Sequence, residues 1–546
     1  MRSYRNPILP GFHPDPSICR VGDTFYLVTS TFEYFPGIPI FKSKNLTDWH
    51  CIAHVLTRPS QIDLIGAPPS GGLFAPTIRY HDGLFYVTCT NVSGGGSFIV
   101  HAQDPAGKWS DPVYVKRRGI DPSLLFADGT CYFLSTENEE GISGIWMCEV
   151  DPITGRMKSY ERLLTRGCGG KYAEGPHLYK ITGKYYLMLA EGGTEYGHRE
   201  TILRSDQPYG PYEPCPYNPI LTHADTMDSP ISCTGHADLV DDTNGRLWLV
   251  CLGVRTLPGV LLHNLGRETF LAPVRWEDGW PFVGRGGRID LMMEANLPGG
   301  KEPDETAPDE GFVADMERET EGFFDEPVLT DLDADGREIR TLELNDLIRE
   351  KAFTFLRNPD MPSYEFDTDE ETLHLTGTDA GLDDWDEQFG SPAWVGVRQE
   401  EFYASVEAEV RLASAENEEP YDGGAGITAY YDNEHHMDVL ITKEEGRFFV
   451  MSRLRVYDIV QEKRIEIPES HVFLRITADP AHYHLYYSVD GEDWEPVDMG
   501  ASAALCTEVT RRMTFTGTFF GFFAEESEGV FRKPRIIFLR DAMGQK

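Results

Sequence analysis

The chain has 546 residues, of which 40% are hydrophobic and 12% aromatic; this composition is that of an ordinary globular protein, and the length predicts two or three domains. A formal net charge of −40 argues against nucleic acids and anionic membranes as partners, because both need clustered Lys and Arg. The first residues, MRSYRNPILPGFHPDP, lack the apolar stretch of a signal peptide. We therefore expect a cytoplasmic protein with neutral or weakly charged ligands.

One outline recurs five times in the first half of the chain. Each copy has a short apolar strand, a turn pair and a second strand rich in Tyr, Phe, Val and Leu, at residues 11–31, 75–91, 121–138, 174–193 and 236–254. The turn pairs are typical of β-hairpins: Gly22-Asp23, Asp82-Gly83, Asp128-Gly129, Thr182-Gly183 and Asn244-Gly245. The spacing of about 45 to 60 residues is close to the period of a propeller blade, which predicts a five-bladed β-propeller over residues 1–296.

Equivalent residues at the start of each copy carry unusual chemistry. In a propeller the first strands line the central axis, so these residues form a ring around one end of the channel. The ring would hold Asp15, Ala75, Asp121, Glu174 (or its neighbour Gly175) and His236. Three carboxylates and a histidine on one concavity would shift one another's pKa values, for which stability alone gives no reason. We interpret them as a functional site rather than as solvated blade tips.

The second half of the chain has a different pattern. Residues 297–327 are acidic and rich in Pro and Gly, which predicts a linker. Residues 328–546 contain many alternating runs, including FYASVEAEVRL, HVFLRITAD and MTFTGTFFGFFAEES, which predict a β-sandwich of the jelly-roll kind. The expected fold class is all-β, a five-bladed propeller followed by a sandwich.

The ten cysteines are dispersed and form no C-x-x-C pair. Those within strand-like runs fit small buried hydrophobic positions, so we expect reduced core thiols and no structural zinc: Cys19, Cys89, Cys131, Cys148 and Cys251.

A funnel lined by carboxylates suits the hydrolysis of glycosidic bonds. That reaction needs one carboxylic acid kept protonated and one carboxylate kept ionised, because the leaving alkoxide is poor and the transition state resembles an oxocarbenium ion. The chain lacks a Walker loop, H-E-x-x-H and G-x-S-x-G, and GGGS at 94–97 has no lysine of a phosphate loop. Phe32, Tyr34 and Phe35 are candidates either for faces that pack on a sugar ring or for the core.

The motifs FHPDPS, GIDPSL, AEGPHL, AEGGTEYGHRETILRS, CTGHADLV and LGRETFLAPVRWEDGWPF together resemble glycoside hydrolase family 43, in particular its two-domain β-xylosidases. PAWVGVRQEEFYASVEAEV and FTGTFFGFFAEES resemble the sandwich of that group. The resemblance implies that Asp15 is the general base and Glu174 the general acid. It also implies that Asp121 orients Glu174 and tunes its pKa, and that the reaction inverts configuration, with the Asp15 and Glu174 carboxyl groups roughly 6.5 to 9.5 Å apart.

The same resemblance implies further site residues. Arg267 matches an arginine that reaches the sugar hydroxyls, and Phe515 matches a sandwich aromatic that closes one wall of the pocket. Phe32 and Phe74 are expected to contact the substrate. No cofactor is required, although His236 matches a histidine that in some relatives helps to hold a divalent cation, often Ca²⁺, through waters. Where relatives commonly read W-A-P-D, this chain has Phe74-Ala75-Pro76-Thr77.

The expected activity is that of an inverting exo-β-1,4-xylosidase acting on xylobiose and short xylo-oligosaccharides, with α-L-arabinofuranosidase as a side activity. As in relatives, we expect a homo-oligomer (dimer or tetramer). A dedicated α-L-arabinofuranosidase is the alternative on the same scaffold, because the departure at residues 74–77 changes subsite shape. A retaining β-fructosidase is disfavoured, since its N-D-P-N and E-C motifs are absent. A non-catalytic carbohydrate-binding protein is disfavoured by the intact set of Asp15, Asp121 and Glu174.

Overall fold

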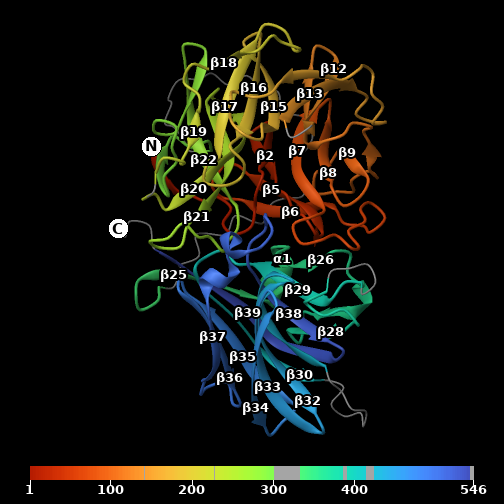
Figure 1. Cartoon of the computed structure of the whole chain (residues 1–546), viewed down its shortest axis with the longest axis vertical. Helices are drawn as coiled ribbons and strands as arrows, with labels where there is room; N and C mark the ends of the chain where they lie inside the picture. Colours follow the sequence, from red (N-terminus) through yellow and green to blue (C-terminus); the bar gives the residue numbers. More distant parts are fainter. Residues whose placement is uncertain (140–141, 227, 300–331, 385–389, 413–422, 542–546) are drawn as a thin grey trace, which may run out of the picture.

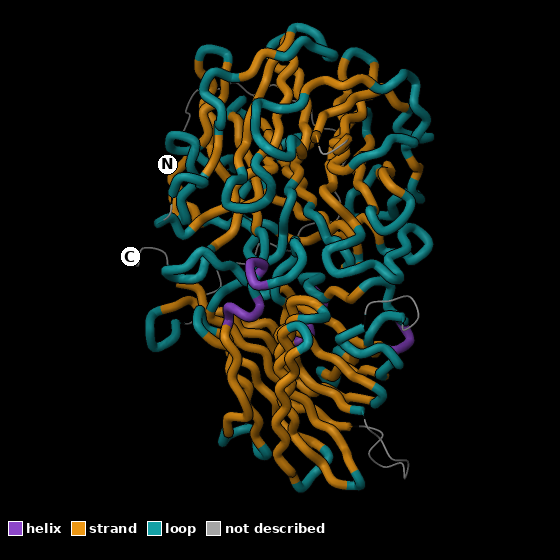
Figure 2. Tube along the Cα trace, in the orientation of Figure 1, coloured by secondary structure: helices purple, strands orange, loops and turns teal. Residues whose placement is uncertain are grey.

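The computed structural model describes residues 1–139, 142–226, 228–299, 332–384, 390–412 and 423–541. Nearly the whole predicted linker at 297–327 lies outside the described residues. Within them, helical structure is confined to α1 (Leu344–Arg349) and the short 3-10 turns η1 (Met361–Ser363), η3 (Ser502–Leu505) and η4 (Thr507–Val509). Figure 2 shows strands throughout both halves of the molecule. The predicted all-β class is confirmed.

Five antiparallel sheets surround an axis in the upper half of Figure 1. Blade 1 contains β2 (Ser17–Val21), β3 (Thr24–Val28), β5 (Gly37–Ser43) and β6 (His50–Leu56). Blade 2 contains β7 (Leu73–His81), β8 (Leu84–Asn91), β9 (Gly96–Ala102) and β10 (Val113–Tyr114). Blade 3 contains β11 (Ile120–Ala127), β12 (Thr130–Glu139), β13 (Ile142–Val150) and β14 (Arg162–Thr165).

Blade 4 contains β15 (Glu174–Ile181), β16 (Lys184–Glu191), β17 (Arg199–Ser205) and β18 (Glu213–Pro214), with β19 (Leu221–Thr222) also paired to β17. Blade 5 contains β20 (Ile231–Asp241), β21 (Leu247–Arg255), β22 (Glu268–Glu277) and β23 (Trp280–Val283). Beside them, β1 (Arg2–Arg5) pairs with β24 (Met292–Ala295). The predicted five-bladed propeller is confirmed.

The turn pairs found in the sequence connect the first two strands of each blade. In blades 2, 3 and 4 both turn residues have positive φ, for example 48° at Asp82 and 79° at Gly83. This is the geometry of a type I′ turn, whose twist matches that of the flanking strands. Blade 5 departs from the pattern, because Asn244-Gly245 lies within a longer connection between β20 and β21.

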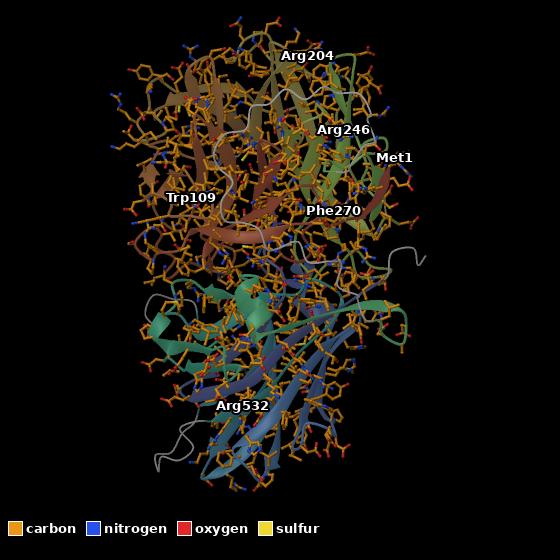
Figure 3. All side chains as sticks on the ribbon, turned by 180° about the vertical axis from the view of Figure 1, so that it is seen from behind. Met1, Trp109, Arg204, Arg246, Phe270 and Arg532 are labelled. Atoms are coloured by element: carbon orange, nitrogen blue, oxygen red, sulfur yellow. The ribbon has the colours of Figure 1, made fainter. Side chains whose placement is uncertain are left out.

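Apolar side chains fill the spaces between neighbouring blades. Between blades 4 and 5, Met188 and Ile202 pack in one cluster with Leu249 and Phe270. Figure 3, seen from behind, places Phe270 and Trp109 in the propeller half and Arg532 in the sandwich half. All ten cysteines are free thiols, and the five predicted core thiols are buried. Among the described residues, no helix has the length and apolar character needed to cross a bilayer.

One buried carboxylate ties four blades together at the axis. Asp238 of β20 accepts hydrogen bonds from the Ser17 hydroxyl at 2.6 Å, the Tyr179 hydroxyl at 2.6 Å and Arg79 Nη1 at 2.8 Å. These partners belong to β2, β15 and β7. The Asp238 side chain is fully buried. Burial alone would raise its pKa, but Arg79 and His177 lower the pKa well below its usual range.

The C-terminal half consists of two large antiparallel sheets. One contains β25 (Arg337–Glu343), β27 (Tyr364–Asp367), β28 (Thr372–Thr376), β39 (Glu528–Asp541), β30 (Tyr403–Leu412), β35 (His471–Ala478), β36 (His482–Ser488) and β37 (Glu495–Ala501). The other contains β34 (Ile459–Ile467), β33 (Arg447–Val456), β32 (His435–Glu444), β31 (Gly424–Asp432), β38 (Phe519–Glu525), β29 (Ala393–Arg398), β26 (Thr354–Leu356) and β4 (Tyr34–Phe35). Side chains from both sheets share one core, which confirms the predicted sandwich.

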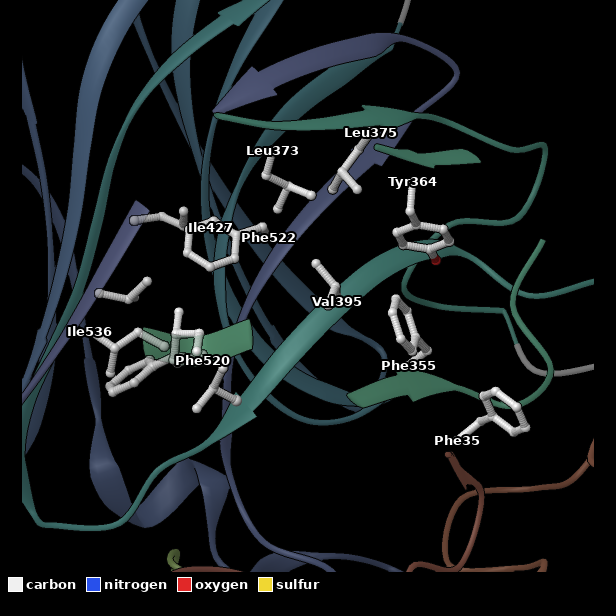
Figure 4. Packing of buried hydrophobic residues seen from close by; sticks show 14 of the residues in the cluster. Phe35, Phe355, Tyr364, Leu373, Leu375, Val395, Ile427, Phe520, Phe522 and Ile536 are labelled. Atoms are coloured by element: carbon white, nitrogen blue, oxygen red, sulfur yellow. The ribbon is translucent and has the colours of Figure 1, made fainter. Parts of the chain in front are cut away.

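The last strand of the second sheet comes from the propeller. β4 pairs with β26 across the two halves, with Phe35 opposite Phe355, and Figure 4 shows Phe35 at the edge of the sandwich core. Tyr34 is buried against Trp394 and Phe519 of the sandwich. Of the two readings that the sequence allowed for Tyr34 and Phe35, the core reading is therefore correct, because both rings fill the junction between the domains.

We predict that Asp238→Ala lowers the free energy of unfolding by about 3 to 5 kcal/mol, because it leaves the Arg79 guanidinium buried and unpaired. Asp241→Ala, on the same strand, is the matched control. Asp241 pairs with Arg20 on the surface, and its side chain is 56% exposed, so its loss should cost less than about 1 kcal/mol. Urea unfolding, followed by tryptophan fluorescence, measures the free energy of unfolding of both variants. Equal losses of this free energy would contradict the claim that Asp238 holds the blades together.

Candidate active site

The five equivalent residues of the repeat, which were predicted to form the ring, share one unusual backbone conformation. Each has a positive φ, which residues other than glycine rarely adopt: Asp15 (54°), Ala75 (31°), Asp121 (52°), Gly175 (57°) and His236 (50°). Gly175, and not Glu174, is therefore the equivalent position in blade 4. Glu174 comes one residue earlier, at the first position of β15. Such strained positions concentrate at functional sites.

Gly175 connects Asp121, Glu174 and His236. Its N–H donates to Asp121 Oδ2 at 3.1 Å, so the Asp121 carboxylate holds the backbone next to Glu174. A Cβ atom at residue 175 would lie 3.0 Å from His236 Nε2. A side chain there would push the imidazole away, which explains why glycine occupies this position.

Asp15 is built to remain ionised. Its Oδ2 accepts the Ser30 hydroxyl at 2.6 Å, and its Oδ1 accepts Arg267 Nη1 at 3.2 Å. His236 Nδ1 lies 3.6 Å from Oδ1. Burial of this carboxylate raises its pKa, but Arg267, His236 and Ser30 together lower it below the ordinary value for aspartate.

Glu174 is built to remain protonated. Burial raises its pKa to about 8, and the neighbouring carboxylates of Asp121 and Asp15 contribute to the rise. The pKa of Asp121 is also raised, mainly by burial and in part by Asp15. A ring that keeps one carboxyl group protonated and another ionised near neutral pH provides an acid and a base together.

Three phenylalanines form an aromatic wall, defined as Phe32, Phe74 and Phe515. The rings of Phe32 and Phe515 are stacked at 5.6 Å, and Phe74 lies 4.9 Å from Phe32 and 5.7 Å from Phe515. Phe515 comes from the sandwich domain, where it precedes β38. Its N–H donates to Ser70 Oγ at 2.9 Å, which fixes this loop to the propeller.

Arg267 joins the aromatic wall to the carboxylates. Its guanidinium carbon lies 5.4 Å from the Phe32 ring centre and 5.1 Å from that of Phe515. Nη1 also donates to Thr194 Oγ1, and Nε donates to the Phe515 carbonyl, both at 3.2 Å. Nη2 is buried and has no hydrogen-bond partner among the described residues. A buried donor without a partner suits a ligand hydroxyl.

The structure thus places Asp15, Asp121, Glu174 and His236 at one end of the propeller, with Arg267 and the aromatic wall beside Asp15. Sequence reasoning missed Ser30, Ser70 and Thr194, which hold Asp15, Phe515 and Arg267. The sequence offers only one signal for them: Thr194 lies in the glycine-rich run EGGTEYG. Ser30 and Ser70 are ordinary loop serines, and only the fold shows what they contact.

The departure at residue 77 has a visible structural role. Thr77 is buried, and its hydroxyl donates to the Pro122 carbonyl at 2.9 Å, next to Asp121. A threonine here supports the neighbouring blade and adds no negative charge.

The residues at the channel do not suit directly bound calcium. Calcium takes six to eight oxygen ligands, whereas His236 supplies one nitrogen and faces Asp15, which Arg267 already neutralises. Among the described residues, the group of three ligating side chains that could hold an ion lies elsewhere, at residues 479–484. A cation held by His236 through waters stays a prediction, and we derive no chemical step from a metal.

Comparison with known proteins identifies the class. Residues 4–281 match glycosyl hydrolases family 43, and residues 349–532 match the β-xylosidase C-terminal concanavalin A-like domain. With its propeller, its sandwich and its ring of carboxyl groups, the protein is a glycoside hydrolase. It belongs to family 43.

Similar proteins cover four fifths or more of the chain. A non-reducing end α-L-arabinofuranosidase of Bacteroides ovatus is 41% identical over 96% of this chain and 91% of its own length. A xylosidase/arabinosidase of Butyrivibrio fibrisolvens is 39% identical over 81% of this chain and 80% of its own. The crystal structure of a xylan β-1,4-xylosidase from Bacillus halodurans has a TM-score of 0.82 and 32% identity, and covers 98% of this chain and 99% of its own.

The opposed pKa shifts predict the pH profile of hydrolysis. Activity should require neutral Glu174 and ionised Asp15, so kcat/KM should fall tenfold per pH unit above about 8, the pKa of Glu174. In acid, activity should persist to a pH below the ordinary pKa of aspartate, because the pKa of Asp15 is lowered.

Asp121→Asn tests the origin of the alkaline limit, because it removes a negative neighbour and should move that limit to lower pH. Asp128→Asn, at the exposed turn of the same blade, is the control and should leave the limit in place. The same alkaline limit in the wild type, Asp121→Asn and Asp128→Asn would contradict the claim that Asp121 raises the pKa of Glu174.

Proposed function

We propose that this chain is an inverting, exo-acting glycosidase that releases xylose from xylobiose and short β-1,4-linked xylo-oligosaccharides. The observation that carries the proposal is the pairing of a raised pKa at Glu174 with a lowered pKa at Asp15 in one ring. Hydrolysis of a glycosidic bond needs this division between a protonated acid and an ionised carboxylate, and the inverting outcome is proposed from the family resemblance.

In the proposed reaction the terminal sugar packs on the aromatic wall, and Arg267 Nη2 donates to one of its hydroxyl groups. Asp15 removes a proton from a water molecule, whose oxygen attacks the anomeric carbon from the face opposite the glycosidic bond. As that bond breaks, Glu174 donates its proton to the leaving oxygen. The products are the terminal sugar with inverted configuration and the shortened oligosaccharide, in which the leaving oxygen has become a hydroxyl group.

Asp121 acts through Glu174 in this proposal. It accepts the N–H of Gly175 and so fixes the chain beside the acid, and its negative charge raises the pKa of Glu174. We regard it as a positioning residue that also keeps the acid protonated.

The exo mode is supported by the origin of the aromatic wall. Phe515 enters from the sandwich domain and contacts Phe32 and Phe74 of the propeller. An aromatic ring held there by Ser70 and Arg267 would block one direction of a long polysaccharide. Cleavage would then be restricted to a chain end.

A second candidate is a dedicated α-L-arabinofuranosidase. It is favoured by the 41% identity to the Bacteroides ovatus protein of that name and by Thr77, which replaces the acid common at this position. The Butyrivibrio relative is named for both activities. Xylopyranose and arabinofuranose are both pentoses, so subsite shape decides between them.

Parallel kinetics on aryl β-D-xylopyranoside, aryl α-L-arabinofuranoside and xylobiose separate these candidates. The proposal expects turnover of xylobiose and a higher kcat/KM for the xyloside. A higher kcat/KM for the arabinofuranoside, with xylobiose intact, would replace it by the second candidate. Binding of xylobiose without hydrolysis of any substrate would instead indicate a carbohydrate-binding protein.

We predict that Glu174→Gln reduces kcat/KM on xylobiose by about 10² to 10⁴-fold, the usual contribution of a general acid. The loss should be much smaller on a substrate with a nitrophenolate leaving group, because that group departs without a proton. Asp15→Asn should reduce both rates to a similar extent, since a water must be activated in either case. Equal losses of Glu174→Gln on both substrates would contradict the acid role.

A further inference from the structure

A hairpin of the sandwich carries a second group of chemically active side chains. Asp479, His482 and His484 each offer one ligand atom, and these atoms lie within 4.8 Å of one another. The side chains of Asp479 and His484 are about one third exposed, so ions can reach them. No residue of this group belongs to the catalytic ring.

The hairpin holds the three side chains on one face. His482 and His484 alternate along β36 with the buried Tyr483 and Leu485, so both imidazoles point away from the core. Asp479 lies in the turn between β35 and β36, where its N–H donates to the His482 carbonyl at 2.9 Å. The ligand atoms are therefore brought together by one short, hydrogen-bonded turn.

The Asp479 carboxylate is oriented by the backbone. Its Oδ1 accepts the N–H groups of Ala481 and His482, at 2.6 and 2.9 Å. Its Oδ2 remains to face His484 Nε2 at 3.2 Å. Hydrogen bonds of this kind to a ligating carboxylate are typical of metal sites, because they fix the direction of the free oxygen.

We propose that Asp479, His482 and His484 bind a divalent transition-metal ion such as Zn²⁺. Two imidazole nitrogens and one carboxylate oxygen suit Zn²⁺, Cu²⁺ or Ni²⁺, whereas Ca²⁺ and Mg²⁺ prefer oxygen ligands. Three protein ligands leave a fourth position of a tetrahedral ion for water.

The site is linked to the active site through the residue between its two histidines. Tyr483 points inward, and its hydroxyl accepts Asn264 Nδ2 at 2.8 Å and donates to Gln399 at 2.7 Å. Asn264 lies three positions before Arg267 on the same propeller connection. An ion that fixes β36 would therefore also stabilise the junction beside the substrate-binding arginine.

Isothermal titration of the full chain with Zn²⁺, free of any histidine tag, tests the proposal. The wild type should bind one more ion per chain than the double variant His482→Ala/His484→Ala. If the number of ions is equal, the affinity of the wild type for its tightest-bound ion should be roughly 100-fold or more higher. His471→Ala is the matched control. His471, the first residue of the neighbouring strand β35, lies beside Glu469 and is about one third exposed. Its removal should leave the titration unchanged.

A second measurement guards against a misfolded variant. Zn²⁺ should raise the melting temperature of the wild type and of His471→Ala, because it binds the folded chain, and should leave that of Asp479→Asn almost unchanged. Without Zn²⁺ all variants should hydrolyse aryl glycosides at the wild-type rate. Equal Zn²⁺ binding by wild type and double variant, or its loss in His471→Ala, would overturn the proposal.

Discussion

The structure depends on closing five sheets around one axis, and the buried Asp238 carboxylate is central to that closure. Strands β2, β7 and β15 donate to it through Ser17, Arg79 and Tyr179. A buried charge is tolerated only when it is paired and fully hydrogen-bonded, so the four blades are fixed relative to one another. This rigidity brings the ring residues together, although they lie up to 221 positions apart in the chain (15 to 236).

Burial and neighbouring charges at the mouth of the closed propeller then separate the pKa values of two carboxyl groups. Asp15 and Glu174 are both carboxyl groups in a buried ring, yet their pKa values move in opposite directions. Arg267, His236 and Ser30 favour the charge on Asp15, whereas Glu174 has carboxylates as neighbours. The sandwich contributes through Phe515, and Arg267 contacts that loop as well as Asp15. In the proposed mechanism, substrate binding and the ionisation of the Asp15 base therefore depend on the same guanidinium group.

Much of this could be predicted from the sequence, because hairpin turns and blade repeats are local signals. Asp82-Gly83 and its counterparts predicted the blades, and the repeat placed Asp15 and Asp121 on one ring. The sequence left open whether Glu174 or Gly175 is the equivalent residue of blade 4. Only the backbone conformation decides this, because Gly175 has the positive φ. Ser30, Ser70 and Thr194 act through long-range contacts that have no local pattern. Strand β4 completes a sheet of the other domain, so Tyr34 and Phe35 could not be told from substrate-binding aromatics.

The central claim is that Asp15 activates a water molecule while Glu174 protonates the leaving group, which inverts the anomeric carbon. Proton NMR of the first minutes of aryl β-D-xylopyranoside hydrolysis tests this directly. Xylose is then the only sugar released, and mutarotation is slower than hydrolysis by an efficient enzyme. The account predicts that the first sugar released from a β-xyloside is α-xylose. Initial release of β-xylose would contradict it, because retention requires a covalent intermediate and a nucleophile in place of the base.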